Sequence, residues 1–187
     1  MLPPDKMPEA EVTLRLAIAL IVRNHVVGDV VVAVDGAQVK TGTRVHFPIV
    51  EFMNSLGWRG VGSSRWQRTY RHQKHEQGIV VHSSLGEGDL VANLSNGKRL
   101  RVESKKGPLH RSKSSQEYPL IREAIGQLMT VEKADPNDVL AVAVPSSEKF
   151  DELARQWRMR PLMAIVGIHI VTVGRDETLS GLESVGI

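Results

Sequence analysis

Residues 139–144 form a run of apolar residues only, Val-Leu-Ala-Val-Ala-Val. A strand without polar alternation is buried on both faces, which is typical of the centre of a parallel sheet. Helices are expected on either side of it, over 117–131 and from 148 to 159, because apolar residues recur there at core spacing. The last strand is expected at 168–173. Strands that alternate with helices imply parallel crossovers, so we expect an α/β fold with a mixed central β-sheet flanked by helices.

The start of the chain is expected to form an addition to this core. Residues 1–9 are rich in proline and should fray, whereas 9–25 should form a helix that is apolar nearly all round and therefore largely buried. A hairpin is expected over 30–40, around an Asp-Gly turn. The chain is accordingly divided into an N-terminal helix and hairpin extension, 1–46, and a core domain, 47–187.

The core domain is expected to begin with a helix at 47–56 and to continue with strands at 78–83, 89–94 and 99–105. Asn96-Gly97 favours a tight turn, so the last two strands should form an antiparallel hairpin. Successive side chains of a strand point to opposite faces, which places the odd-numbered residues of 99–105 together on one face.

Composition excludes several classes of protein. No cysteine occurs among the 187 residues, which excludes disulfide scaffolds, thiolate zinc sites, iron–sulfur clusters and cysteine nucleophiles. The longest apolar run, residues 16–22, is far too short to span a bilayer, and the N-terminus lacks the basic region of a secretory signal. These features predict a cytoplasmic protein that does not act in a membrane.

The formal net charge of +3 conceals two strongly basic segments. Residues 59–75 carry +5 and residues 98–113 carry +6, so the rest of the chain carries −8. Such segregation favours a polyanionic partner, nucleic acid first, although solvated loops are the more common use of charge runs. In the first segment two aromatic residues are expected to stack on bases. The residues expected to contact nucleic acid are Arg65, Trp66, Arg68, Tyr70, Arg71, Lys74, Lys106, Arg111 and Lys113.

The residues that carry chemistry are Asp89, Glu103 and Lys105. The expected hairpin brings Asp89 beside the strand on which Glu103 and Lys105 share a face. Carboxylate oxygens suit Mg²⁺ or Mn²⁺, and a bound metal acidifies a water and neutralises a phosphate. A lysine can hold or deprotonate the attacking water and stabilise the transition state. The structural alternative is a surface strand with alternating charges and a cross-strand ion pair.

These residues resemble the motif of the PD-(D/E)XK nuclease superfamily, which includes restriction endonucleases, Mrr-type enzymes and Holliday-junction resolvases. Asp89 stands where the family has the Asp of its Pro-Asp, with Gly88 in place of the proline, and Glu103-Ser104-Lys105 stands where it has (D/E)XK. The order of expected elements over 47–173 is also similar. The resemblance implies a restriction endonuclease-like core, Asp89 and Glu103 as metal ligands, the Ser104 carbonyl as a further ligand and Lys105 as the catalytic lysine.

Two more residues are similar to accessory residues of this superfamily. Glu51 lies on the expected helix before the hairpin, where many members place a glutamate; an exposed helix charge is the equal alternative. Gln127 lies on the helix after the (D/E)XK strand, where several members carry a glutamine. The tyrosine that some subfamilies have four residues later is Val131 here, and plain helix surface is the alternative for Gln127.

Together these observations predict a Mg²⁺-dependent DNA endonuclease that serves restriction, defence, repair or recombination, with RNA as an alternative substrate. A homodimer is expected because one site cuts one strand, and the apolar helix 9–25 is the candidate interface. One alternative is a non-catalytic DNA-binding or assembly subunit that retains the fold, although such a subunit has no need for two acids that face phosphate. Another is a hydrolase that does not act on nucleic acid, or a scaffold protein, in which the motif is a coincidence. Such a protein would not require the charge segregation.

Overall fold

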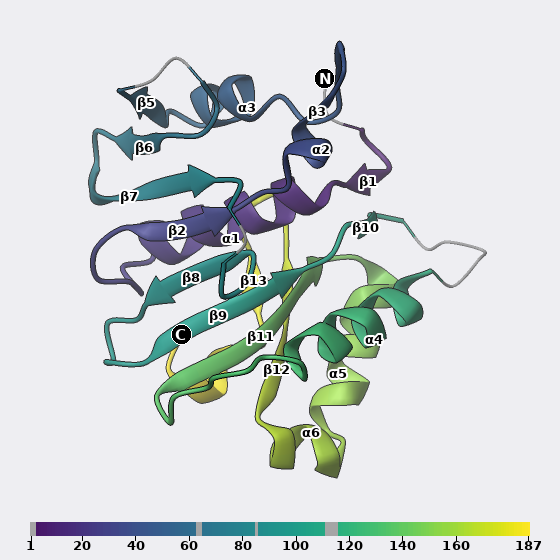
Figure 1. The fold of residues 1–187 in the computed structure, drawn as a ribbon. Coiled ribbons are helices and arrows are strands. Elements are labelled where there is room, and N and C mark those ends of the chain that lie inside the picture. The colour runs from purple at the N-terminus through teal and green to yellow at the C-terminus, as the bar shows by residue number, and fades with distance from the viewer. Residues whose placement is uncertain (1–2, 63–64, 85, 111–115) are drawn as a thin grey trace.

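The strand pattern produces a nine-stranded mixed sheet with helices on both faces (Figure 1). The computed structural model describes residues 3–62, 65–84, 86–110 and 116–187. From edge to edge the strands are β13 (Leu179–Ser180), β12 (Ile168–Val173), β11 (Asp138–Pro145), β9 (Arg99–Ser104), β8 (Leu90–Asn93), β2 (Val30–Ala33), β7 (His75–His82), β6 (Thr69–His72) and β5 (Arg59–Val61). Within these described residues, no helix has both the length and the apolar character needed to cross a membrane.

The second half of the chain folds as its periodicity predicts. Strands β9, β11 and β12 are parallel, and the crossovers between them contain α4 (Glu117–Leu128), α5 (Glu148–Arg158) and the short α6 (Pro161–Val166). Strands β8 and β9 form the expected antiparallel hairpin, in which Gly97 adopts a φ of 82°. Helices α4 and α5 pack on one face of β11 through their own apolar cluster (Figure 1). The mixed α/β sheet flanked by helices is therefore confirmed.

Helix α1 (Glu9–Val22) covers the opposite face of the sheet, behind β2 in Figure 1. It contacts β2, β7, β9, β11 and β12, and every residue from 10 to 21 is buried. Burial includes two charged side chains, Glu11 and Arg15, which pair at 2.8 Å, while Arg175 near the C-terminus also pairs with Glu11 at 2.9 Å. Since α1 lies within the protein, it cannot be the dimer interface that its apolar sequence suggested.

Segment 1–46, expected as an N-terminal extension, contributes strand β2 to the central sheet. Strand β2 lies between β7 and β8, and it pairs with them parallel and antiparallel respectively. The hairpin expected over 30–40 is wrong: Asp35 caps the short helix α2 (Gly36–Val39) by accepting a hydrogen bond from the Ala37 N–H at 2.9 Å. Residues after α2 form a small hairpin and a helix, namely β3 (Lys40–Thr41), β4 (Arg44–Val45) and α3 (Ile49–Ser55).

Residues 6 and 7 are paired in a strand and do not fray as expected. Lys6 and Met7 form β1 (Lys6–Met7), which pairs antiparallel with β10 (Gly107–Pro108). Met7 is fully buried, and Arg175 donates hydrogen bonds to the carbonyls of Pro3 and Lys6. This two-stranded ladder fixes the start of α1 beside the end of β9, because β10 follows β9 after two residues.

Candidate active site

Asp89 lies opposite Glu103 in the β8–β9 hairpin. The Asp89 N–H donates to the Val102 carbonyl at 2.8 Å, and the Ser104 N–H donates to Asp89 Oδ2 at 2.8 Å. The preceding Gly88 has a φ of 132°, and a Cβ there would lie 2.8 Å from the Val102 carbonyl oxygen. Proline is restricted to φ near −65°, so this approach of the two strands excludes it. The departure from the Pro-Asp motif therefore has a local cause, and the aspartate is still positioned against β9.

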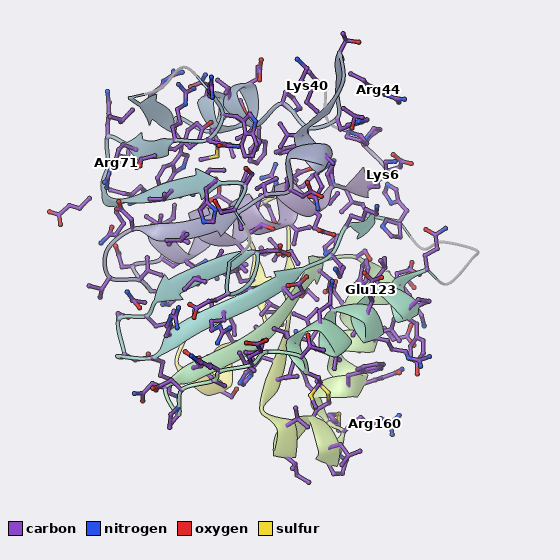
Figure 2. All side chains as sticks on the ribbon, in the orientation of Figure 1. Lys6, Lys40, Arg44, Arg71, Glu123 and Arg160 are labelled. Atoms are coloured by element: carbon purple, nitrogen blue, oxygen red, sulfur yellow. The ribbon has the colours of Figure 1, made fainter. Side chains whose placement is uncertain are left out.

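Lys105 lies at the end of β9 with two glutamates around its ammonium. Its Nζ is 3.5 Å from Glu103 Oε1 and 3.3 Å from Glu123 Oε1 on α4, which Figure 2 labels. The lysine is only 5% exposed because α4 packs on this face of β9. The opposite face presents Leu100 and Val102 to the core under α1. The alternation expected for this strand is thus confirmed, and the odd-numbered face carries the charged cluster.

Glu9 is a member of the cluster that the sequence analysis missed. It is the first residue of α1, and its carboxylate acts electrostatically on Asp89, Glu103 and Lys105. Gln38 Nε2 donates to Glu9 Oε1 at 2.6 Å and holds this side chain in place. Glu9 could have been noticed as the acidic first residue of an apolar helix. It was not considered because residues 1–9 were expected to fray.

Burial and like charge raise the pKa of both hairpin carboxyls. The pKa of Asp89 is raised to about 7, first by burial and then by the Glu103 carboxylate, while the Ser104 N–H opposes the shift. Burial also raises the pKa of Glu103, against the effect of Lys105. Burial alone would lower the pKa of Lys105, but the carboxylates of Glu9, Glu103 and Glu123 outweigh it and raise this pKa. Several acids thus share one ammonium, an arrangement that a divalent cation would stabilise.

The donor set fits Mg²⁺ or Mn²⁺ bound mainly through water. Asp89 and Glu103 supply hard oxygen ligands on neighbouring strands. Among the described residues, no three acidic or histidine side chains are grouped closely enough to hold a metal by themselves. Mg²⁺ is often bound by one or two carboxylates together with several waters and substrate phosphates, and Asp89 and Glu103 could provide such a pair. The Ser104 carbonyl stays a prediction as the further ligand.

The two accessory residues have different positions. Gln127 is exposed on α4, and it lines a hollow of about 450 Å³ together with Glu103 and Gly88. It therefore borders the cluster, although Glu123, one turn earlier on α4, is the residue that reaches Lys105. This i, i+4 spacing was the available signal for Glu123.

Glu51 lies elsewhere. It is exposed on α3 and acts electrostatically on Tyr70 of β6. Four strand spacings separate β6 from β9, about 19 Å. Glu9, not Glu51, is the helix carboxylate that reaches the cluster.

The basic segment 59–75 forms β5, β6 and the start of β7, and much of it is used within the fold. Tyr70 is fully buried and its hydroxyl donates to the Trp66 carbonyl at 3.0 Å, so the expectation that Tyr70 stacks on bases is wrong. Arg68 lies over the Tyr70 ring at 5.2 Å, and Trp66 packs half-buried against the core. Arg71 makes two hydrogen bonds of 2.7 Å to the Asp29 carboxylate.

The remaining nucleic-acid candidates divide into exposed residues and residues that the structure does not describe. Arg65, Lys74 and Lys106 are exposed, so their contact with nucleic acid stays a prediction. Arg111 and Lys113 lie outside the described residues.

The comparisons with known proteins gave no matching family model, curated protein or solved structure. The interpretation of the site therefore depends on its own geometry and on the motif in the sequence.

Proposed function

We propose that this protein is a metal-dependent nuclease of the PD-(D/E)XK type that hydrolyses phosphodiester bonds in DNA. One observation supports it most strongly: two partly buried carboxyls, Asp89 and Glu103, lie together near the ammonium of Lys105. A structural ion pair requires only one acid for this lysine. A second, partly buried acid with a raised pKa destabilises the folded protein once it is ionised, and such groups concentrate at functional sites.

In this proposal Asp89 and Glu103 hold Mg²⁺ or Mn²⁺. When bound, the ion acidifies a water and neutralises charge on the scissile phosphate. Asp89 is positioned for this role by the Ser104 N–H, which donates to Oδ2 and leaves Oδ1 available. Glu103 is positioned on the adjacent strand, and Gln127 borders the same hollow, where it can donate to a substrate oxygen.

Lys105 acts as a hydrogen-bond donor in this proposal. Three carboxylates raise its pKa, so the side chain is an ammonium at neutral pH rather than a free base. An ammonium can donate to the attacking water or to a phosphate oxygen as negative charge develops there. Glu123 and Glu9 are positioning residues in this proposal, because they act on the charge of Lys105.

Cleavage assays test this proposal directly. Supercoiled, linear and branched DNA, and a single-stranded RNA, are incubated with the protein in Mg²⁺, Mn²⁺, Ca²⁺ or EDTA. Cleavage is expected with Mg²⁺ or Mn²⁺, binding without turnover with Ca²⁺, and no cleavage in EDTA. Full activity in excess EDTA would contradict the proposal. DNA binding without cleavage in every divalent metal would favour a non-catalytic subunit instead.

Cleavage of both DNA strands would need a second copy of the chain, so a homodimer stays part of the proposal. Its interface cannot be α1, which is buried. Exposed apolar side chains lie instead on and before α6, where Met159, Leu162 and Ile165 are 81%, 72% and 78% exposed. Light scattering of the wild type and of Leu162→Glu/Ile165→Glu tests this surface, and a monomeric wild type would contradict the dimer.

A further inference from the structure

A groove of about 1030 Å³ opens beside the candidate active site, at the edge where β1 pairs with β10. Its lining includes Glu9, which also acts on Asp89, Glu103 and Lys105. Glu9 is therefore common to the lining of the groove and to the electrostatics of the cluster. The groove lining also includes accessible apolar side chains such as Val45 and Leu120, which form its apolar floor.

Three exposed cations line this groove: Lys6, Arg44 and Lys106. Within the described part of the chain, none of the three forms an ion pair or donates a side-chain hydrogen bond. Lys40 stands nearby on the β3–β4 hairpin, and Figure 2 shows Lys6, Lys40 and Arg44 at one corner of the molecule, away from Arg71. Lysine and arginine side chains without ion pairs create a positive potential around the groove, which favours binding of a polyanion.

The fold brings these cations together from three distant segments. The β1–β10 ladder aligns Lys6 with Pro108, so that Lys6 and Lys106 border the same end of β9. Arg44 comes from the β3–β4 hairpin, where it lies opposite Thr41 in the strand register. Two acids also line the groove, Asp5 and Glu9, and Gln38 holds Glu9 through a hydrogen bond.

We propose that this groove binds the phosphodiester backbone of the nucleic-acid strand next to the scissile bond. The proposal rests on the proposed nuclease function and adds the path of the substrate. Phosphates would lie against Lys6, Arg44 and Lys106, and sugars or bases would cover the apolar floor. In this proposal Lys6, Arg44 and Lys106 bind the phosphodiester backbone, in place of the residues expected in segment 59–75.

A salt titration of labelled single-stranded and duplex DNA oligonucleotides in EDTA tests the groove. The groove variant is Lys6→Ala/Arg44→Ala/Lys106→Ala, and the matched control, Arg59→Ala/Lys98→Ala/Arg160→Ala, removes the same charge from exposed residues elsewhere. Each lost phosphate contact lowers the slope of log K against log salt by about 0.7 to 0.9. The groove variant should lower this slope by about 2 to 3, with affinity at low salt reduced roughly 10- to 100-fold. The control should change the slope by less than about 1.

The outcomes separate this proposal from the nuclease function. An unchanged slope in the groove variant, or an equal loss in the control, overturns the groove even if the wild type cleaves DNA. A wild type that neither cleaves nor binds overturns both. Lys6→Arg/Arg44→Lys/Lys106→Arg should keep the wild-type slope, and a loss of binding in this charge-preserving variant at an unchanged melting temperature would also contradict the groove.

Discussion

Two regions of the molecule are rich in basic residues, but they use their charge differently. In segment 59–75, Arg71 is paired with Asp29 and Arg68 lies on the buried Tyr70. At the end of β9, Lys6 and Lys106 border the groove without an ion pair in the described residues, and Lys105 is surrounded by excess carboxylate. In the first region Arg68 and Arg71 are engaged within the fold, whereas beside the second Lys6 and Lys106 have charge left for a partner.

The comparison shows that a basic segment in a sequence is a poor measure of available charge. The second basic segment illustrates this within a single strand. Arg99 pairs with Glu87, and Arg101 pairs with Asp138 at 3.0 Å while only 4% exposed. The buried pair of Arg101 with Asp138 positions the strand, whereas Lys106 beyond its end is exposed.

Replacement of Glu103 should cause the largest loss of cleavage activity among the variants that compare the two regions. We expect Glu103→Gln to reduce cleavage by about a thousandfold or more, because the side chain keeps its shape but loses its charge as a ligand. The matched control, Glu51→Gln, should cleave DNA within about twofold of the wild type, since a helix surface charge contributes little. Equal losses of cleavage activity in Glu103→Gln and Glu51→Gln would contradict a catalytic role for the cluster at the end of β9.

The pH dependence of stability should differ between wild type and Asp89→Asn. A carboxyl with a raised pKa stabilises the fold while protonated, and this stability is lost as pH rises from about 4 to the folded pKa of about 7. Above pH 7, in EDTA, Asp89→Asn should therefore be more stable than the wild type by roughly 2–4 kcal/mol. Urea unfolding from pH 4 to 8 measures the difference. A stability difference that stays constant with pH would contradict the raised pKa.

A smaller effect is expected from Glu9, the carboxylate that links the groove with the cluster. Glu9→Gln should lower the cleavage rate by about tenfold, because Lys105 loses one of three carboxylates that hold its charge. The pH–rate profile provides the specific readout, since the limb assigned to Lys105 should move to lower pH. An unchanged profile would mean that Glu9 only supports the fold.

The smallest effect is expected in segment 59–75. Arg71→Ala should lower the free energy of unfolding by about 1 kcal/mol or less, because its pair with Asp29 is partly exposed. Its salt slope for DNA should equal that of the wild type, as the arginine is already paired. A lower slope with unchanged stability would show that this segment binds DNA after all.

Regular elements of this fold were largely predictable because their signals are local. The apolar run of β11, the Asn96-Gly97 turn and the alternation of β9 each follow from a few neighbouring residues. The insertion of β2 between β7 and β8 was not, because a parallel partner some 50 residues away leaves no local mark. An Asp-Gly pair can start a helix as well as a turn, and Asp35 does so here.

The candidate site was predictable to the same extent. The hairpin carries Asp89, Glu103 and Lys105 within one local unit, so their spacing was enough to bring them together. Glu9 and Glu123 reach the cluster through tertiary packing of α1 and α4, which no spacing along the chain encodes. Tyr70 was misassigned because an aromatic residue among arginines has the same sequence pattern whether it is buried or exposed.

The central claim is that the carboxylates of Asp89 and Glu103 form a divalent-cation site and not a structural ion pair. A titration with Mn²⁺ followed by electron paramagnetic resonance tests it, with the wild type and Asp89→Asn compared at the same pH. We expect the wild type to bind one Mn²⁺ per chain and Asp89→Asn to lose most of this binding, since one of two carboxylate ligands is removed. Equal Mn²⁺ binding by the two proteins, or no binding by either, would contradict the claim.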